Sequence, residues 1–467
     1  MKKFIVFCLI LIVTVSLGAT VWYFVRDNEE LVIDMQPYVY MNVGDTLPVD
    51  ARVKNAKVGS ELKISVLGDE NQDSNTAVLY WNELTERLEA NKGGAAIVEI
   101  KVLNSELSPV YIEVGIGDGS KDAPFYVDSE EDLTNIGKED FPANSYFILM
   151  QDIVLSSTIK PICNGSSFNG TFNGNGYTIS GLNISEAEAD GVEYAGLFSK
   201  IGAEGVVTSL TLSNVNISGQ FKSAGAFAGI NYGTITRCNA ISGEVKSSYQ
   251  NGELGANVGG IAGDVIYSAG SVGRIDRCFV DLSVKGTQNV GGLAGATTGG
   301  IIINSYVKQS DNNSVSSLKD NSNVGGLVGL VSYFGDSNQA TIKNCYALAN
   351  VQVDDTFTGS NYGLVIGNNS EPSKYAHNNL MGNYTQKSLN PSLNAVGTQI
   401  DIFEGLTDQQ KEQKASEKAN FRGVYDEFTY DAEGNIDKSL MLSYIAAVVV
   451  NGTDKIYRDY ENVWMIG

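Results

Sequence analysis

The sequence predicts an all-β chain that combines an N-terminal transmembrane helix, a β-sandwich, and a parallel β-solenoid with short capping helices. Three observations predict this fold class: an uncharged apolar run opens the chain, short alternating segments follow it, and a glycine-rich phrase then recurs at a nearly constant spacing. We expect four parts, which are the helix (1–28), the sandwich (29–120), the solenoid (121–384) and the end and cap of the solenoid (385–467).

The N-terminal run Phe4–Val25 contains no charged residue and is long enough to cross a bilayer as a helix. Lys2 and Lys3 precede it, so the positive-inside rule predicts that everything from Asp27 onward lies outside the cytoplasm. A cleaved signal peptide is the alternative, although the run exceeds the usual apolar core of about 7–15 residues. We therefore expect a single-pass protein of the cell membrane whose bulk is extracellular, or a secreted protein if the segment is cleaved.

Residues 31–114 carry short runs in which apolar and polar residues alternate, such as LKISVLG and VYIEVGIG. This pattern predicts an antiparallel sandwich. The segment resembles a bacterial immunoglobulin-like domain of the second group in VGDTLPVDARV (Val43–Val53), Trp81 and ERLEANKGGAAIVEIKV (Glu86–Val102). The resemblance implies an immunoglobulin-like sandwich.

A glycine phrase recurs through much of the remaining chain, as NVGGIAG from Asn257, NVGGLAG from Asn289 and NVGGLVG from Asn323, with weaker copies. The first glycines of the copies are Gly196, Gly225, Gly259, Gly291, Gly325 and Gly363, which lie 29 to 38 residues apart. A period of about 20–50 residues indicates a repeat array. We expect the leucine or isoleucine of each phrase to fill the core, and the glycines to lie where the backbone turns or approaches the next coil.

A second phrase accompanies the first and begins at a position that we expect to be buried. We align this position as Ile179, Val207, Ile235, Ile275, Ile302 and Ile342, at intervals of 27, 28 or 40 residues. The long intervals predict inserted loops, with SSYQNGELGA and QSDNNSVSSLKDNS as candidates. Two more inward columns follow three and five residues later, and because a strand buries every second residue, the step of three predicts a corner. A chain that turns this way in each repeat is expected to form a parallel β-solenoid.

These phrases, with FNGTFNGNGYTISGLNIS (Phe168–Ser185) and YAGLFSKI (Tyr194–Ile201), resemble GLUG-motif repeat domains over residues 124–384. Such repeats occur in exported bacterial surface proteins, including adhesin-like ones, and beside the catalytic domain of some streptococcal immunoglobulin A peptidases. YENVWMIG at the C-terminus resembles the closing strand of these modules. The resemblance implies an extracellular surface protein.

Two short helices are expected at the ends of the solenoid. Ser129 and Asp132 form a capping-box pattern and Gly137 ends the segment, so a helix there would cover the open edge of the first coil. GLTDQQKEQKASEKAN is expected to be a surface helix that begins at Thr407, with Gln410 as its capping partner.

Composition excludes several kinds of chemistry. A net charge of −22 disfavours nucleic-acid binding, and a chain with one histidine, His377, cannot carry an HExxH zinc site. No CxxC pair or nucleophile elbow is present, and Asp354–Asp355 lacks a calcium-loop pattern. We expect no catalytic residue, no metal and no cofactor. Cys238 and Cys278 fall in one inward column on adjacent coils, where they act as small buried side chains or form a cross-link.

The candidate binding residues are two arginines and four aromatic residues. Arg237 and Arg277 lie two residues after the aligned position on consecutive coils, where stacked arginines could meet an anionic glycan. Loops are expected to present the aromatic residues, since these dominate binding hot spots. They are Tyr249, Tyr267, Tyr333 and Phe334.

The sequence thus predicts a non-catalytic, membrane-anchored surface protein, adhesin-like, whose partner is an extracellular glycan, a cell-wall polymer or a host surface protein. Solenoids offer long surfaces suited to extended partners. The alternatives are a carbohydrate-active enzyme, such as a polysaccharide lyase or hydrolase, on the same scaffold, and a purely structural envelope protein.

Overall fold

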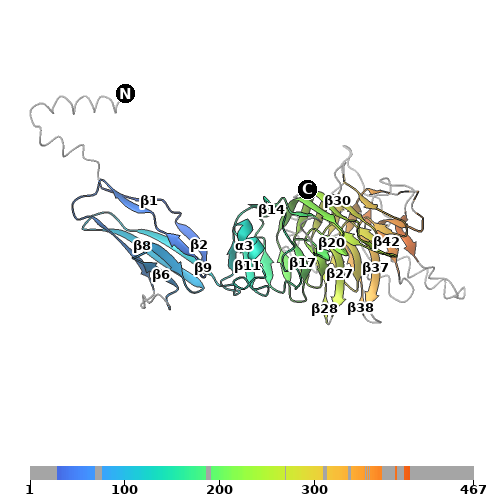
Figure 1. The fold of residues 1–467 in the computed structure, drawn as a ribbon, viewed down its shortest axis with the longest axis horizontal. Helices are drawn as coiled ribbons and strands as arrows, with labels where there is room; N and C mark the ends of the chain where they lie inside the picture. Colours follow the sequence, from blue (N-terminus) through green and yellow to red (C-terminus); the bar gives the residue numbers. More distant parts are fainter. Residues whose placement is uncertain are drawn as a thin grey trace, which may run out of the picture. The chain divides into compact units, whose positions relative to one another are not determined.

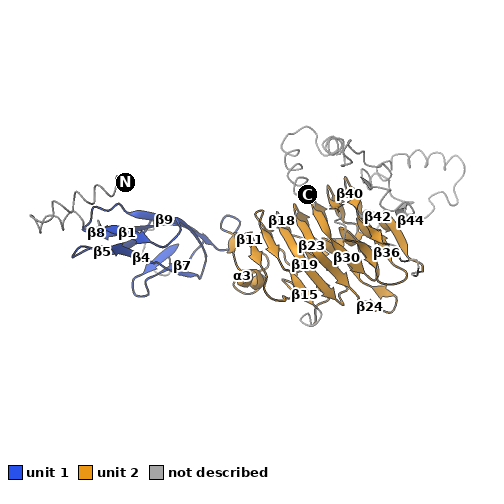
Figure 2. Ribbon diagram, turned by 90° about the horizontal axis from the view of Figure 1, so that it is seen from above, with its two compact units in different colours: residues 1–123 blue, residues 124–467 orange. Residues whose placement is uncertain are grey.

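The computed structural model describes residues 29–68, 76–185, 191–268, 270–308, 313–334, 338–352, 354, 356, 358–370, 384–385 and 394–399. The chain divides into two compact units, unit 1 (Met1–Ala123) and unit 2 (Pro124–Gly467), which Figure 2 draws in separate colours.

Unit 1 is a β-sandwich built from short strands. One sheet has the order β2-β9-β8-β5, a second has the order β3-β7-β6, and β1 pairs with β4. The strands are β1 (Glu30–Ile33), β2 (Tyr38–Asn42), β3 (Thr46–Pro48), β4 (Ala51–Lys54), β5 (Glu61–Leu67), β6 (Leu79–Asn82), β7 (Arg87–Ala90), β8 (Gly94–Leu103) and β9 (Val110–Gly117).

The core of unit 1 follows from the alternation seen in the sequence. Val98, Ile100, Ile112 and Ile116 are at most 1% exposed and pack in one cluster, while their neighbours along β8 and β9 face outward. The expectation of a wholly antiparallel sandwich is wrong at one edge, because β2 pairs with β9 in parallel. The immunoglobulin-like assignment stays a prediction.

The predicted fold class is wrong in its membrane element. In the part of the chain that the structure describes, no helix is long and apolar enough to span a bilayer. The helix found there, α3 (Glu130–Asn135), has six residues and three acidic residues in its first turn, whereas a span needs about 20 apolar residues. Phe4–Val25, on which the transmembrane prediction rested, lies outside the described residues.

Unit 2 is a parallel β-solenoid whose coils stack along three sheets (Figure 1). The first sheet consists of β10 (Phe125–Val127), β11 (Tyr146–Leu149), β13 (Thr171–Asn173), β18 (Val206–Thr208), β22 (Thr234–Thr236), β29 (Arg274–Asp276), β33 (Ile301–Ile303) and β39 (Thr341–Lys343). The second consists of β12 (Ile153–Val154), β14 (Thr178–Ser180), β15 (Asn183–Ser185), β19 (Thr211–Gly219), β23 (Asn239–Ser247), β30 (Phe279–Gly286), β34 (Tyr306–Lys308), β35 (Val315–Ser317), β40 (Tyr346–Leu348), β41 (Val351–Gln352) and β43 (Tyr384–Thr385).

The third sheet holds the glycine phrases and two hairpins. It consists of β16 (Tyr194–Ala195), β17 (Phe198–Ile201), β20 (Ser223–Gly225), β21 (Ala228–Asn231), β26 (Asn257–Gly259), β27 (Ala262–Ser268), β28 (Ser271–Val272), β31 (Asn289–Gly291), β32 (Ala294–Thr298), β36 (Asn323–Gly325), β37 (Val328–Phe334), β38 (Asn338–Gln339), β42 (Asn361–Asn369) and β44 (Asn394–Gln399). A further hairpin, β24 (Gln250–Asn251) with β25 (Leu254–Gly255), lies within the candidate insertion SSYQNGELGA.

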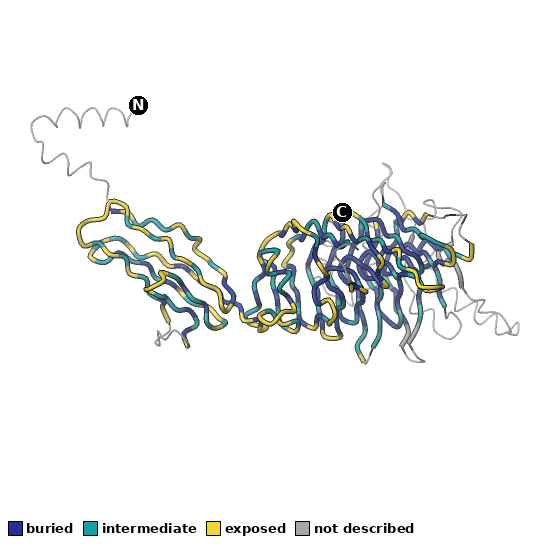
Figure 3. Tube along the Cα trace, in the orientation of Figure 1, coloured by how far each residue is buried: buried dark blue, intermediate teal, exposed yellow. Residues whose placement is uncertain are grey.

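The solenoid interior is apolar and stacked in register, as Figure 3 shows by its buried trace. Along the first sheet, parallel pairing puts one inward side chain of each coil into a single column. That column is Phe125, Phe147, Phe172, Val207, Ile235, Ile275, Ile302 and Ile342, none more than 6% exposed. The predicted all-β, parallel stacking is therefore confirmed.

One residue of the predicted alignment is wrong. Ile179 belongs to β14 of the second sheet, where it pairs with Leu212, and Phe172 takes its place in the first column. In this coil an apolar residue lies on each side of the corner, Phe172 before it and Ile179 after it, and a longer loop between them shifts the spacing. The predicted corner itself is present, because the residue two positions after the column has a left-handed backbone in five successive coils. These residues are Ser209, Arg237, Arg277, Asn304 and Asn344, with φ between 52° and 56°.

The glycine phrases form the strands of the third sheet, where the backbones of neighbouring coils approach closely. A Cβ on Gly291 would lie 2.7 Å from both Leu327 O and Val328 Cα, and closer still to Ala294 O. The φ of Gly291 is not in the left-handed region, so no turn requires a glycine here. Glycine is needed because the backbone of the next coil leaves no room for a Cβ. Leu293 of the same phrase is fully buried in the core.

Helix α3 caps the first coil as the sequence predicts. The Ser129 side chain accepts a hydrogen bond from Asp132 N at 3.1 Å, which satisfies one of the free amides of the first turn. Leu133 supplies the buried face of the helix and packs into the solenoid core. The second predicted helix, at Gly405–Asn420, lies outside the described residues.

Candidate binding surface

The predicted arginine pair lies on the left-handed corner between the first and second sheets. Arg237 is exposed and Arg277 is half-buried, and their Cα atoms belong to adjacent coils, which stack about 4.8 Å apart. The Arg277 Nε atom is buried and has no hydrogen-bond partner among the described residues. Two like charges on neighbouring coils, at positions where a left-handed backbone disfavours residues other than Gly, Asn and Asp, make this corner a candidate anion-binding point.

We predict that Arg277→Asn leaves stability unchanged or raises it by about 0.5–1 kcal/mol, because Asn adopts the left-handed conformation more readily than Arg. Asn304 and Asn344 already occupy the same corner on the next two coils. Thermal unfolding followed by circular dichroism measures the change. A fall in the unfolding midpoint would show that Arg277 stabilises the coil through contacts that outweigh its backbone strain.

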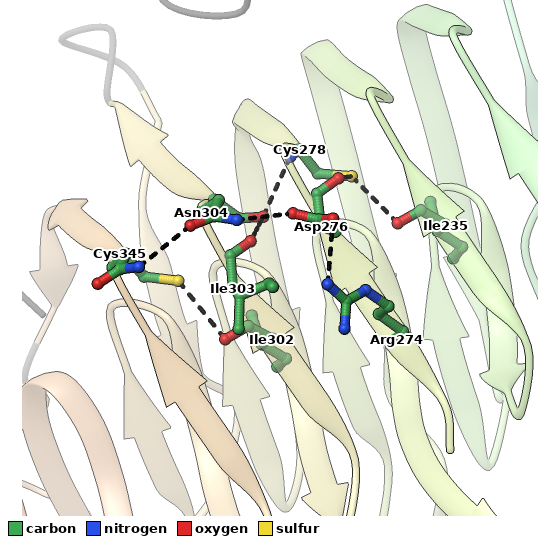
Figure 4. A network of polar contacts seen from close by, with 10 residues as sticks. Ile235, Arg274, Asp276, Cys278, Ile302, Ile303, Asn304 and Cys345 are labelled. Atoms are coloured by element: carbon green, nitrogen blue, oxygen red, sulfur yellow. Dashed lines mark hydrogen bonds and ion pairs between the residues drawn. The ribbon is translucent and has the colours of Figure 1, made fainter. Parts of the chain in front are cut away.

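A polar network runs beside this corner on the outer face of the first sheet (Figure 4). The Asp276 carboxylate accepts hydrogen bonds from Arg274 Nη2 at 3.2 Å and from Asn304 Nδ2 at 3.0 Å. Asn344 Nδ2 in turn donates to Asn304 Oδ1 at 3.3 Å. Asp276 thus joins its own coil to the next, and the Asn304–Asn344 hydrogen bond extends the network to a third coil.

The aromatic candidates Tyr267, Tyr333 and Phe334 lie at a different corner, where β27 and β37 extend into the hairpins β27–β28 and β37–β38 (Figure 1). Thr298 of β32, on the coil between them, pairs with Ile266 on one side and with Ser332 on the other. Tyr267 and Tyr333 therefore hold equivalent backbone positions two coils apart, about 9.6 Å. The two hairpins lie on either side of the coil that contains β32, and that coil passes this corner without an inserted hairpin.

Tyr249 lies at a third corner, away from the other candidates. It is half-buried and packs against the solenoid core, and its backbone oxygen accepts a hydrogen bond from Thr287 Oγ1 at 2.5 Å. The structure thus pairs Arg237 with Arg277 and places Tyr267 near the Tyr333–Phe334 segment. It does not unite all six residues in one site.

The structure contains a ladder of asparagines that was not predicted from the sequence, although an asparagine is the first residue of every NVGG phrase. Each side-chain amide donates Nδ2 to the Oδ1 of the preceding coil at 2.6–2.7 Å, from Asn361 to Asn323, Asn289 and Asn257. The ladder ends where Asn257 Nδ2 donates to Asp264 Oδ1 at 2.8 Å. The repeated Asn was the signal that could have revealed the ladder, because stacked coils bring like residues together.

Asp264 forms the acidic end of this ladder. Burial raises its pKa to about 6, while hydrogen bonds from Ser223 and Asn257 act in the opposite direction. Ser223 Oγ also lies 2.7 Å from Gly229 O. A protonated Asp264 can donate a hydrogen bond to Ser223 Oγ while Ser223 donates to Gly229 O. With Asp264 neutral, the carboxyl, the hydroxyl and the carbonyl therefore all have hydrogen-bond partners.

We predict that Asp264→Asn removes a pH dependence of stability. The folded pKa lies above the unfolded value of 3.8, so the folded state binds the proton more tightly and stability falls as pH rises from about 4 through about 6. An Asn at this position can make the bonds of the neutral acid, and it should remove a loss of about 2–3 kcal/mol between pH 4 and pH 7. Unfolding midpoints of both proteins across this range test it. Parallel pH profiles would contradict the assignment.

The described residues hold no group of three or more His, Cys, Asp or Glu side chains placed to bind a metal. Asp354 accepts a hydrogen bond from Thr356 N, and Asp355 and His377 lie outside the described residues.

Cys238 and Cys278 lie on adjacent coils, as predicted, and are not joined by a disulfide. Burial raises the pKa of the Cys238 thiol to about 12, which makes it an inert core side chain.

Comparisons with known proteins support the repeat assignment. The sequence pattern of the GLUG motif matches residues 320–352. Halomucin from Haloquadratum walsbyi is 35% identical over 153 residues, which cover 30% of this chain and 2% of halomucin. A putative Gly-rich membrane protein from Evansella cellulosilytica is 33% identical over 129 residues, or 26% of this chain and 14% of that protein.

Two further matches have protease names. Immunoglobulin A1 protease from Streptococcus sanguinis is 29% identical over 292 residues, which cover 54% of this chain and 15% of the protease. The crystal structure of a putative immunoglobulin A1 protease from Bacteroides ovatus aligns with 61% of this chain and 80% of that chain, at 21% identity and a TM-score of 0.45. The chain spans 2–15% of the length of the three curated relatives.

The fold and the repeated corner define a parallel β-solenoid with one coil per sequence repeat. Residues 320–352 carry the GLUG motif, and this matched coil, with NVGGLVG, stacks in register on the earlier coils that carry NVGGLAG and NVGGIAG.

Proposed function

We propose that this protein acts outside the cell, at the cell surface, as a non-catalytic, adhesin-like protein that binds an extended polymer along its solenoid. The observation that carries the proposal is the pair of hairpins, bearing Tyr267 and Tyr333–Phe334, on either side of a coil without an insertion. Such hairpins can be elaborated without disturbing the stacked core beneath them, and loops on a rigid scaffold are common binding elements.

The names of two relatives support a surface location, since one is a halomucin and another a Gly-rich membrane protein. Three classes of polymer fit the proposal on chemical grounds, namely a glycan, a cell-wall polymer and a host surface protein. Arg237 and Arg277 favour an anionic glycan, because guanidinium groups bind carboxylates and sulfates strongly.

A non-catalytic role is favoured by the way the solenoid uses its partly buried carboxylates. Asp276 is engaged by Arg274 and Asn304, and Asp264 by Ser223 and Asn257. A glycoside hydrolase would need two carboxyl groups about 5–10 Å apart that are directed at a substrate. These two carboxyl groups instead connect coils.

Binding of polygalacturonate to the full chain tests the proposal. Arg237→Asn combined with Arg277→Asn should weaken binding at least tenfold, whereas Lys343→Gln, which removes a cation from the outer face of β39, should leave it unchanged. Tyr267→Ala should also weaken binding. Equal affinity of all variants would contradict the arginine corner, and shortening of the polymer during incubation would instead indicate a carbohydrate-active enzyme.

A further inference from the structure

The outer face of the four-stranded sheet of unit 1 carries an unusual set of exposed side chains. Tyr38 and Tyr40 of β2 are 60% and 53% exposed, and Ile97 of β8 and Leu67 of β5 are 42% and 40% exposed. Glu113 of β9 is exposed between them. These residues alternate with the buried core residues of the same strands, so they share the face that points away from the sandwich interior.

Strand pairing brings these residues into two adjacent rows. Tyr38, Glu113, Ile97 and Leu67 follow one another across β2, β9, β8 and β5. In the next row Tyr40 lies opposite Gly115, which lies opposite Ala95. The small residues leave a hollow of about 510 Å³ beside the tyrosine rings, lined also by Glu113, Ile97 and Leu67. This volume lies in the range of ligand sites, about 300–1,000 Å³.

The charged side chains on this face form two groups, with Glu99, Lys101 and Lys63 toward one end and the solvent-exposed Glu113 in the row of Tyr38. Tyr111 Oη lies 3.3 Å from Glu99 Oε1, and Glu99 Oε2 lies 3.3 Å from Lys101 Nζ. Glu113 has no hydrogen-bond or ion-pair partner for its carboxylate among the described residues. A lone carboxylate beside two exposed tyrosines offers both an anionic partner and aromatic faces to a cation.

The sheet face is poorly suited to self-association. In a two-fold contact centred on the row of Tyr38 and Glu113, the two Glu113 carboxylates would approach each other, and like charges at an interface are unfavourable. The same arrangement suits a ligand that presents apolar C–H faces, hydroxyl groups and a positive charge together. Sugars with free amino groups have this combination.

We infer that the outer face of sheet β2-β9-β8-β5 in unit 1 binds a glycan chain that carries free amino groups. Tyr38 and Tyr40 stack on the sugar rings, and Glu113 pairs with an ammonium group of the ligand. Ile97 and Leu67 extend the apolar floor along the row. The site lies in unit 1 and is independent of the polymer-binding role proposed for the solenoid.

Calorimetric titration of the full chain with the β-1,4-linked hexamer of glucosamine tests this site. Tyr38→Ala and Glu113→Gln are each expected to weaken binding at least tenfold. Tyr177→Ala, which removes another exposed tyrosine in unit 2, should leave binding unchanged, as should the Arg237→Asn and Arg277→Asn pair. Both informative positions are exposed, so the variants are expected to fold, and circular dichroism verifies this.

Two comparison ligands make the test decisive. Cellohexaose has the same linkage without amino groups and should bind at least tenfold more weakly, and equal affinity would overturn the role given to Glu113. A hexalysine peptide that binds more tightly than the glucosamine hexamer, and loses affinity in Tyr38→Ala, would replace the glycan with a basic peptide. Failure of the glucosamine hexamer to bind would overturn the site without affecting the proposal for the solenoid.

Discussion

Replacing Gly291 with alanine is expected to destabilise the solenoid by about 3 kcal/mol or more. The new Cβ would lie within 2.7 Å of backbone atoms of Leu327 and Val328 on the next coil and closer to Ala294 O, and backbone on both sides leaves no flexible side chain to move away. Denaturant unfolding of the full chain, followed by circular dichroism, measures the loss.

Gly176→Ala is the matched control for this effect. Gly176 has a φ of +84° and nothing within 4 Å of the position of a Cβ, so its substitution should cost only about 1 kcal/mol, from backbone conformation. If Gly291→Ala costs no more than Gly176→Ala, the two strands of the glycine phrase do not approach as closely as the structure has them.

Truncation of Ile302 to alanine is expected to cost about 2–5 kcal/mol, because it opens a cavity in the stacked column of the first sheet. Ile302 is fully buried and lies between Ile275 and Ile342 of the neighbouring coils. The loss is expected to exceed the transfer free energy of the removed atoms, since the neighbours are fixed by two ladders of backbone hydrogen bonds and can relax only partly.

The adjacent residue of the same strand provides the control. Ile303 lies on the outer face of β33 and is half-buried, so Ile303→Ala should cost less than about 1 kcal/mol. The two variants remove the same atoms from neighbouring positions of one strand. The change in β-propensity is therefore the same in both, and it cancels when their stabilities are compared. Equal unfolding midpoints for both would contradict the inward assignment of Ile302.

The solenoid was predictable from sequence because its coils repeat the same local constraints. Val207, Ile235, Ile275, Ile302 and Ile342 recur ahead of a step of three residues, and that step requires the corner that the structure places at the left-handed residue. Ile179 was misplaced because the first coils have a longer loop, around Asn175 and Gly176, which shifts the spacing. A single apolar residue cannot indicate on which side of a corner it lies.

The candidate binding residues were less predictable, since spacing along the chain does not show which corner of a coil a loop occupies. Tyr249 and Tyr267 are 18 residues apart in sequence but lie at separate corners, because the chain passes through the third sheet between them. The face containing Tyr38 and Glu113 was missed because its residues come from four strands that alternate with core positions. Only the pairing of these strands brings them together.

The parallel register of the coils has a mechanical consequence. The backbone hydrogen bonds between coils run along the axis of the stack, so tension applied between the first and last coils loads these bonds in series and peels coils from an end. Each coil of roughly 30 residues would release about 100 Å of chain. A tether of this kind lengthens in steps and dissipates work while the remaining coils stay folded.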